Sequence, residues 1–128
     1  AYEIRLSLVG SEMCIRDSVI NPTLARGQIE GGIAQGIGLA LMEEYLPSRT
    51  ENLHDYLIPT FGDVPPIESL LIEVPDPEGP FGAKGLGEHV LIPTAPAILN
   101  AIRHATGTEI TRVPALPHRV WEAMEERT

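Results

Sequence analysis

Two rows of residues, each with a spacing of four, run through residues 24–45 and constrain the fold more than any other feature. The first row is apolar and consists of Ile29, Ile33, Ile37 and Leu41. The second row is small and consists of Gly32, Gly36 and Ala40. A spacing of four places side chains on one face of a helix, and each interior glycine costs about 1 kcal/mol relative to alanine. We therefore predict a helix over Leu24–Tyr45 that another backbone or a flat ligand approaches closely, with close helix packing the better interpretation.

The other helices are predicted from their end signals. Asn21 or Thr23 is expected to cap the first helix. A second helix, Thr94–Thr106, is expected to begin at its capping threonine and to end at Gly107. A third helix is predicted over Pro117–Glu126.

Strands are predicted between these helices. The clearest is Ser69–Val74 (SLLIEV), and a shorter one is expected near Glu109–Val113. Tyr56–Phe61 is interrupted by Pro59, which makes it edge-like or irregular. The resulting order of helix, strand, loop, helix, strand and helix predicts an α+β fold.

A glycine-rich loop, Gly79–Glu88 (GPFGAKGLGE), carries four glycines, one lysine and one glutamate. Successive N–H groups in such turns can form a concave anion site. The loop is not a Walker A element, because glycine follows Lys84, and it is not a dinucleotide fingerprint, because Val90 stands where glycine is needed. Composition alone is equally compatible with a surface turn. The chemical interpretation is a general base, Glu88, beside amide donors for an anion or a cofactor.

Composition excludes several other classes of protein. The 128 residues form at most one domain, and the net charge of −9 argues against binding to nucleic acid. The charge-free window Gly31–Met42 is shorter than the ~20 residues of a membrane span. The four histidines are scattered without metal-ligand spacing. A single cysteine, Cys14, excludes an internal disulfide and suggests a reducing compartment, so we expect a cytoplasmic protein.

Residues 1–18 differ in character from the rest of the chain. They contain no proline, although twelve prolines follow, and they lack the apolar region of a signal peptide. The string LSLVGSEMCIRDS within them resembles a translated sequencing-adapter artefact found in proteins from assembled environmental DNA. We therefore expect residues 1–18 to be non-native, with native sequence beginning near Val19 and a reading frame truncated upstream. The inference from Cys14 would then no longer apply.

Five motifs occur in order between Val19 and about Met124. They are VINP (19–22), GQIEGG followed by QGIG (27–38), YLIPT (56–60), GPFGAKGLGE (79–88) and PTAPAI (93–98). Each motif is weak alone. Together they resemble the C-terminal end of the molybdenum-binding large subunit of the xanthine dehydrogenase/aldehyde oxidase family. Residues 19–128 are accordingly expected to be the C-terminal part of a molybdopterin-binding domain.

This resemblance implies an enzyme that hydroxylates an electron-poor C–H carbon with oxygen derived from water. It implies a molybdopterin cofactor, as such or as its cytosine dinucleotide, whose dithiolene rather than any side chain holds the molybdenum. Glu88 would take the proton from Mo–OH while hydride passes to a sulfido ligand. Gln28 would reach the cofactor near the metal. The backbone around which the cofactor packs would be Ala83, Lys84, Gly85, Leu86 and Gly87, with the Lys84 side chain orienting or structural.

The same resemblance implies partners outside this chain. These are the rest of the large subunit, [2Fe–2S] and FAD domains or subunits, and a small-molecule substrate such as a purine, an aldehyde, another N-heterocycle or carbon monoxide. The 128 residues alone are expected to be inactive. Two alternatives stay open, namely a stand-alone module that binds a phosphorylated molecule at the Gly82–Gly87 amides, with Lys84 pairing its charge, and a non-catalytic assembly domain that docks through the glycine-rich helix.

Overall fold

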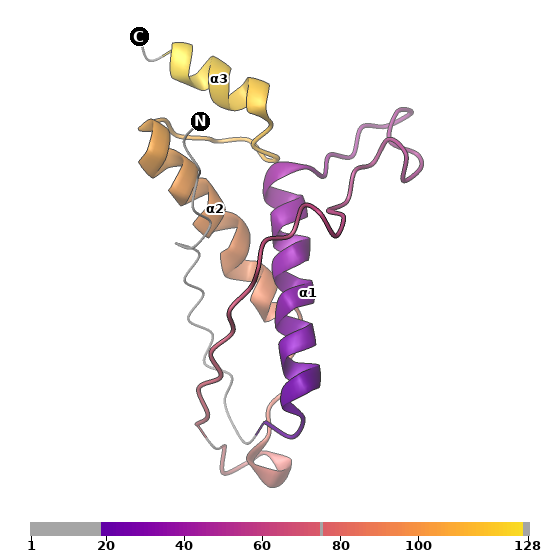
Figure 1. Ribbon diagram of the computed structural model, residues 1–128, viewed down its shortest axis with the longest axis vertical. Coiled ribbons are helices and arrows are strands. Elements are labelled where there is room, and N and C mark those ends of the chain that lie inside the picture. Colours follow the sequence, from indigo (N-terminus) through magenta and orange to yellow (C-terminus); the bar gives the residue numbers. More distant parts are fainter. Residues whose placement is uncertain (1–18, 75, 127–128) are drawn as a thin grey trace.

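The computed structural model describes residues 19–74 and 76–126. Residues 1–18, expected to be non-native, lie outside this part. The described chain forms three α-helices and two short 3₁₀ helices (Figure 1). They are α1 (Pro22–Leu41), η2 (Pro80–Gly82), η3 (Glu88–Val90), α2 (Leu91–Thr106) and α3 (Pro117–Glu125).

Helix α1 begins at Pro22, two residues before the predicted Leu24, and ends four residues before the predicted Tyr45. The Asn21 side-chain oxygen accepts a hydrogen bond from the Leu24 amide at 3.1 Å, which confirms Asn21 as the N-cap. After Leu41 the chain folds back, and the amide of Glu43 donates to the carbonyl of Gly38 at 2.8 Å. A Cβ on Gly38 would overlap the Glu43 carboxylate and lie 2.7 Å from Pro59 Cδ. The helix therefore ends where the returning chain covers Gly38.

Helix α2 begins earlier than predicted. It starts at Leu91, directly after η3, so the prediction that Thr94 is its N-cap is wrong. Thr94 is fully buried inside the first turns, where its hydroxyl donates to the carbonyl of Val90 at 2.8 Å. This bond to the residue four positions earlier satisfies the hydroxyl within the helix. The predicted end is confirmed, because Gly107 has a left-handed φ of 70°.

The predicted strands are absent from the described residues. Ser69–Val74 and Glu109–Val113 adopt no strand or helix, so the β part of the predicted α+β fold is wrong for the described chain. A strand exists only when a second extended segment accepts and donates its backbone hydrogen bonds. The described residues provide no such segment. Helix α3 ends one residue before the prediction.

Helices α1 and α2 run in the same direction and pack closely through the small-residue row (Figure 1). A Cβ on Gly32 would lie 2.7 Å from the Val90 Cβ, and a Cβ on Gly36 would lie 2.5 Å from the Thr94 Cβ. Both distances are far below normal contact, so only glycine allows this approach. The prediction of close helix packing is thus confirmed, and α2 with the preceding η3 is the neighbour.

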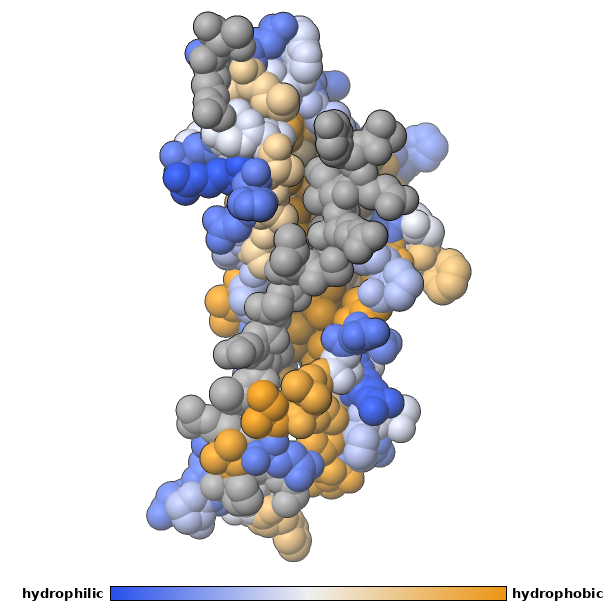
Figure 2. Space-filling view, turned by 60° about the vertical axis from the view of Figure 1, so that its left-hand side comes forward, coloured by the Kyte–Doolittle hydropathy of each residue, from blue (hydrophilic) through white to orange (hydrophobic). Residues whose placement is uncertain are grey.

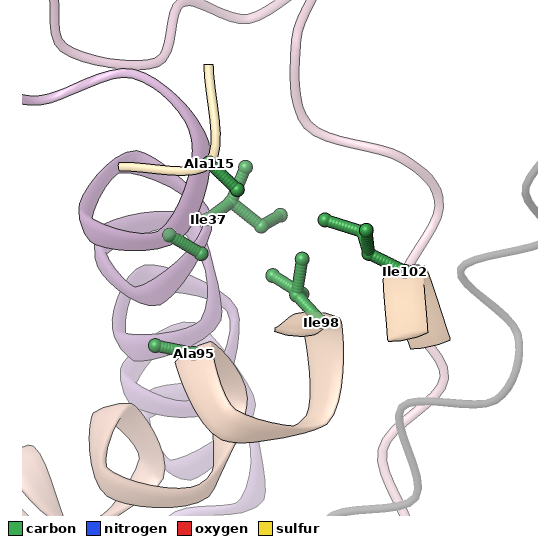
Figure 3. Close-up of a cluster of buried hydrophobic side chains, with 6 residues drawn as sticks. Ile37, Ala95, Ile98, Ile102 and Ala115 are labelled. Atoms are coloured by element: carbon green, nitrogen blue, oxygen red, sulfur yellow. The ribbon is translucent and has the colours of Figure 1, made fainter. Parts of the chain in front are cut away.

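The apolar core lies between the C-terminal half of α1, α2 and the segment before α3 (Figure 3). Ile98 and Ile102 on α2 project toward Ile37 on α1 and toward Ala115. The amide of Ala115 donates to the carbonyl of Ala40 at 2.7 Å, which attaches the segment before α3 to the end of α1.

A charged cluster joins the chain just after α1 to α3. The Arg119 guanidinium donates to Glu44 Oε1 at 2.6 Å and to the carbonyl of Pro114 at 3.0 Å, and Arg112 donates to the same glutamate oxygen at 2.9 Å. The hydrogen bond from Arg119, together with both positive charges, lowers the pKa of Glu44. The cluster therefore holds Glu44 in its charged form.

Candidate functional site

The glycine-rich loop is a tightly bonded turn at the end of the molecule where α1 begins (Figure 1). The carbonyl of Asp76 accepts from Gly79, the amide of Asp76 donates to Gly82, and the amide of Gly82 donates to Gly79 at 2.9 Å. A Cβ on Gly79 would collide with the carbonyl oxygen of Ala83. Gly79 is therefore required where the two arms of the turn meet.

Two residues at the tip of the turn have left-handed backbones. Gly82 has a φ of 76°, which glycine adopts at little cost, whereas Phe81 has a φ of 56°. The Phe81 side chain is 92% exposed. The turn thus holds an aromatic ring in solvent on a strained backbone.

Lys84 closes the turn by an ion pair. Its Nζ lies 2.9 Å from Asp76 Oδ2, and both side chains are partly exposed. Asp76 provides a countercharge that a phosphate group would otherwise supply. This geometry fits the interpretation of Lys84 as a structural residue, and it weakens the alternative in which Lys84 pairs with a ligand phosphate.

The segment from Gly85 to Glu88 presents polar groups to solvent. The His89 ring donates through Nε2 to the carbonyl of Gly85 at 2.9 Å. This hydrogen bond links the residue after Glu88 to the loop before it. Within the described part of the chain, the amides of Gly85–Gly87 have no acceptor, and a Cβ on Gly85 would meet nothing within 4 Å. The Glu88 side chain is exposed. A carboxylate therefore stands beside three N–H donors that have no acceptor in the described chain.

Helix α1 places Gln28 at the same end of the helix pair as Glu88. Gly32 contacts Val90 in η3, and Glu88 is the first residue of η3. Gln28 lies one turn before Gly32 and is exposed, with open space beside Gly31. The contacts Gly32–Val90 and Gly36–Thr94 advance four residues on each helix. Continuing this pattern four residues toward the N-terminus pairs Gln28 with Leu86. Gln28 is therefore placed beside the loop that leads to Glu88.

The site combines one carboxylate, one carboxamide, open amide donors and uncovered backbone. Such a set can accept a proton at Glu88 and hydrogen-bond a polar planar group through Gln28 and the loop amides. Residues 19–74 and 76–126 contain no group of three or more His, Cys, Asp or Glu side chains that could hold a metal ion. None of their helices is long and apolar enough to cross a membrane.

Comparison with known proteins identifies what these residues resemble. Residues 17–65, which include Gln28, match the family described as molybdopterin cofactor-binding domain. The chain is 44% identical over 110 residues to a putative xanthine dehydrogenase molybdenum-binding subunit of Escherichia coli K12, a match that covers 81% of this chain and 15% of the relative. It is 42% identical over 113 residues to an aldehyde oxidoreductase of Megalodesulfovibrio gigas, covering 84% of this chain and 12% of that protein.

Solved structures agree with these sequence matches. Quinoline 2-oxidoreductase from Pseudomonas putida 86 superposes with a TM-score of 0.81 and 39% identity over 88% of this chain and 15% of that one. Aldehyde oxidoreductase from Desulfovibrio gigas gives a TM-score of 0.77 and 44% identity over 82% of this chain and 12% of that one. The fold is that of a piece of a molybdopterin-binding domain. The chain belongs to the molybdenum-binding subunits of the xanthine dehydrogenase and aldehyde oxidoreductase family.

Three features of the site were missed at the sequence level. Asp76 pairs with Lys84, the His89 ring holds the Gly85 carbonyl, and Gly32 positions η3 through Val90. The glycine row indicated a close neighbour for Gly32 without identifying it. No sequence pattern pointed to the roles of Asp76 and His89.

Proposed function

We propose that this chain supplies the base-bearing part of the active site of a molybdopterin-dependent hydroxylase. The observation that carries the proposal is the contact of Gly32 with Val90. It brings the helix turn that carries Gln28 and the 3₁₀ helix that begins with Glu88 to one end of the molecule. Family membership supports the same assignment.

The described residues fit a molybdopterin group. Gly85 and Gly31 leave open space where a side chain would stand, so a flat molecule could approach the backbone. The amides of Gly85, Leu86 and Gly87 and the Gln28 carboxamide would donate hydrogen bonds to its polar atoms, while Ala83 and Lys84 keep the turn closed behind them. When bound, as the pterin or its cytosine dinucleotide, the cofactor supplies the molybdenum, its reactive oxygen ligand and the electron sink for oxidation.

Glu88 is the general base in this proposal. Its exposed carboxylate would accept the proton of the attacking hydroxyl group, which makes the oxygen a stronger nucleophile toward an electron-poor carbon. The His89–Gly85 hydrogen bond fixes the backbone on both sides of Glu88. A base held in this way needs little reorganisation when it accepts the proton.

The test replaces Glu88 with glutamine in the complete subunit, whose reading frame would be recovered from the source DNA. Glu88→Gln keeps the size and the hydrogen-bonding capacity of the side chain but removes the basic oxygen. We expect turnover to fall by about 10²–10⁴-fold while the molybdenum and pterin contents stay normal. Glu78→Gln changes an exposed carboxylate directly before the same loop; it is the matched control and should leave turnover unchanged.

Normal turnover in Glu88→Gln would contradict the assignment of the base and would favour a non-catalytic assembly domain. Loss of cofactor would instead show that Glu88 acts in binding. An upstream reading frame without large-subunit sequence would refute the proposed function itself.

The whole enzyme extends beyond this chain, which spans 15% and 12% of the relatives described above. We propose that the remainder of the large subunit completes the cofactor and substrate pockets. Iron–sulfur and FAD domains or subunits would carry electrons away, and the enzyme would act in the cytoplasm. The substrate would be an N-heterocycle or an aldehyde, the classes named for relatives such as quinoline 2-oxidoreductase and aldehyde oxidoreductase.

A further inference from the structure

Residues 67–74 form an extended segment whose side chains alternate in exposure. Ile67, Ser69 and Leu71 are half-buried against the chain. The residues between and after them are exposed, namely Glu68, Leu70, Ile72, Glu73 and Val74, so the alternation runs from Ile67 to Ile72. A period of two is the signature of strand-like backbone. Residues 67–72 therefore alternate as the side chains of a strand do, and they overlap the predicted strand Ser69–Val74.

The backbone of this segment is unpaired within the described part of the chain. The carboxylate of Glu73 accepts a hydrogen bond from the amide of Val19 at 3.0 Å, but the main-chain groups of 67–74 have no partner among the described residues. A row of free N–H and C=O groups is the edge to which another extended segment pairs.

Three exposed side chains of the segment, Leu70, Ile72 and Val74, are apolar. Leu70 is 80% exposed, Val74 is 51% exposed and Ile72 is 41% exposed. Apolar surface is also seen over the lower part of the face in Figure 2. Exposed apolar residues arranged on one side of an unpaired strand indicate a surface that is covered in the assembled protein.

We infer that residues 67–74 are a docking edge for an extended strand from the part of the large subunit that this chain does not span. The inference rests on the proposed function, because that function makes the chain part of a much longer subunit. The matched relatives are more than five times as long as this chain. The remaining part of such a subunit is long enough to supply the pairing strand. The backbone groups of a helix are hydrogen-bonded within the helix, so a helix cannot pair with the N–H and C=O groups of an extended segment, whereas a strand can.

Hydrogen exchange tests the pairing directly. The amides of 67–74 should exchange at least about tenfold more slowly in the complete subunit than in the 128-residue chain. The exposed residues Glu51–Leu53, whose amides have no acceptor in the described chain, serve as the reference for unprotected amides, and α1 serves as the reference for protected ones. Equal exchange of 67–74 in the two proteins would overturn the inference.

A pair of substitutions tests the apolar side of the edge. Leu70→Asp should lower the melting temperature or the soluble yield of the complete subunit while leaving the melting temperature of the 128-residue chain unchanged. Leu53→Asp is the matched control, because Leu53 is similarly exposed, at 71%, but lies outside the segment. If both substitutions affect the complete subunit equally, the edge has no specific partner and the inference fails.

Two further outcomes separate this inference from its alternatives. Protection of 67–74 that rises with the concentration of the 128-residue chain alone would make a second copy the partner and would overturn the inference. Free exchange of 67–74 in a complete subunit that retains cofactor and turnover would overturn the docking edge while leaving the proposed function intact. If residues 67–74 are protected in a complete subunit whose turnover is insensitive to Glu88→Gln, the docking edge stands and the proposed function fails.

Discussion

Gly36 shows how a single residue sets the distance between the two long helices. A Cβ at this position would lie 2.5 Å from the Thr94 Cβ, and Thr94 is fully buried. We expect Gly36→Ala to destabilise the chain by about 1–3 kcal/mol, because the steric overlap outweighs the gain in helix propensity. Thermal or urea unfolding of the 128-residue chain measures the change.

Gly31→Ala is the matched control, because a Cβ on Gly31 would meet nothing within 4 Å. Its replacement should stabilise the folded chain by about 0.5–1 kcal/mol through helix propensity alone. If both alanine variants changed stability in the same direction, the close contact between α1 and η3–α2 would not determine the packing.

At the scale of elements, Glu44 joins the chain after α1 to α3 and makes this junction sensitive to acid. Its pKa is lowered by the hydrogen bond from Arg119 and by both arginine charges. A lowered folded-state pKa means that the stabilisation is complete above the ordinary value of 4.5 and is lost as the pH falls through the lowered value. We expect Glu44→Gln to reduce the loss of stability between pH 5 and pH 3, measured by urea unfolding against pH.

Asp63 also has a lowered pKa, because the Thr60 hydroxyl and amide donate to its carboxylate. Asp63 should contribute the same loss of stability in acid to the unmodified chain and to Glu44→Gln. The difference in stability against pH between these two proteins therefore reports on the Glu44 cluster alone. An unchanged pH profile in the variant would show that the arginine bonds do not persist in solution.

The two arginines of the cluster are expected to contribute unequally. The Arg119 side chain is 16% exposed and also bonds the Pro114 carbonyl, whereas the Arg112 side chain is 67% exposed. Arg119→Ala should therefore destabilise the chain by about 1–3 kcal/mol, and Arg112→Ala by less than about 1 kcal/mol. Equal effects in urea unfolding would contradict this ranking.

At the scale of the whole molecule, the described chain presents the residues of the proposed cofactor site on its surface. Glu88, Gln28 and Gly85 are exposed, and Leu86 and Gly87 are partly buried. We expect the purified 128-residue chain to bind no molybdenum and no pterin, because the proposed function requires the rest of the large subunit to complete the cofactor pocket. Metal analysis and pterin fluorescence are the measurements, and stoichiometric amounts of both would refute this expectation.

The sequence predicted local features well. The Asn21 cap, the Gly107 end of α2 and α3 follow from single residues acting on their neighbours, and all appear in the structure. Features that depend on distant contacts were less predictable. The early end of α1 depends on Pro59 and Glu43 returning to Gly38, and the start of α2 depends on η3 packing against Gly32.

The strands show the same limit. Alternating apolar residues gave residues 67–74 their extended form, but pairing requires a partner that the described residues do not contain. For the site, the motifs led to Glu88, Gln28 and the loop amides, and their chemical roles stay proposals. The ion pair of Lys84 with Asp76 and the bond of His89 to Gly85 became visible only in three dimensions.

By itself, the sequence determined where the helices form, that one of them must have a very close neighbour, and which family the chain resembles. These properties depend on residue type, spacing and order. Only the tertiary structure decided that the neighbour is η3 with α2, and that this contact brings Gln28 and Glu88 to one end of the helix pair. The physical reason is that glycine permits close approach from any partner, and the partner is selected by packing between segments almost 60 residues apart in the chain.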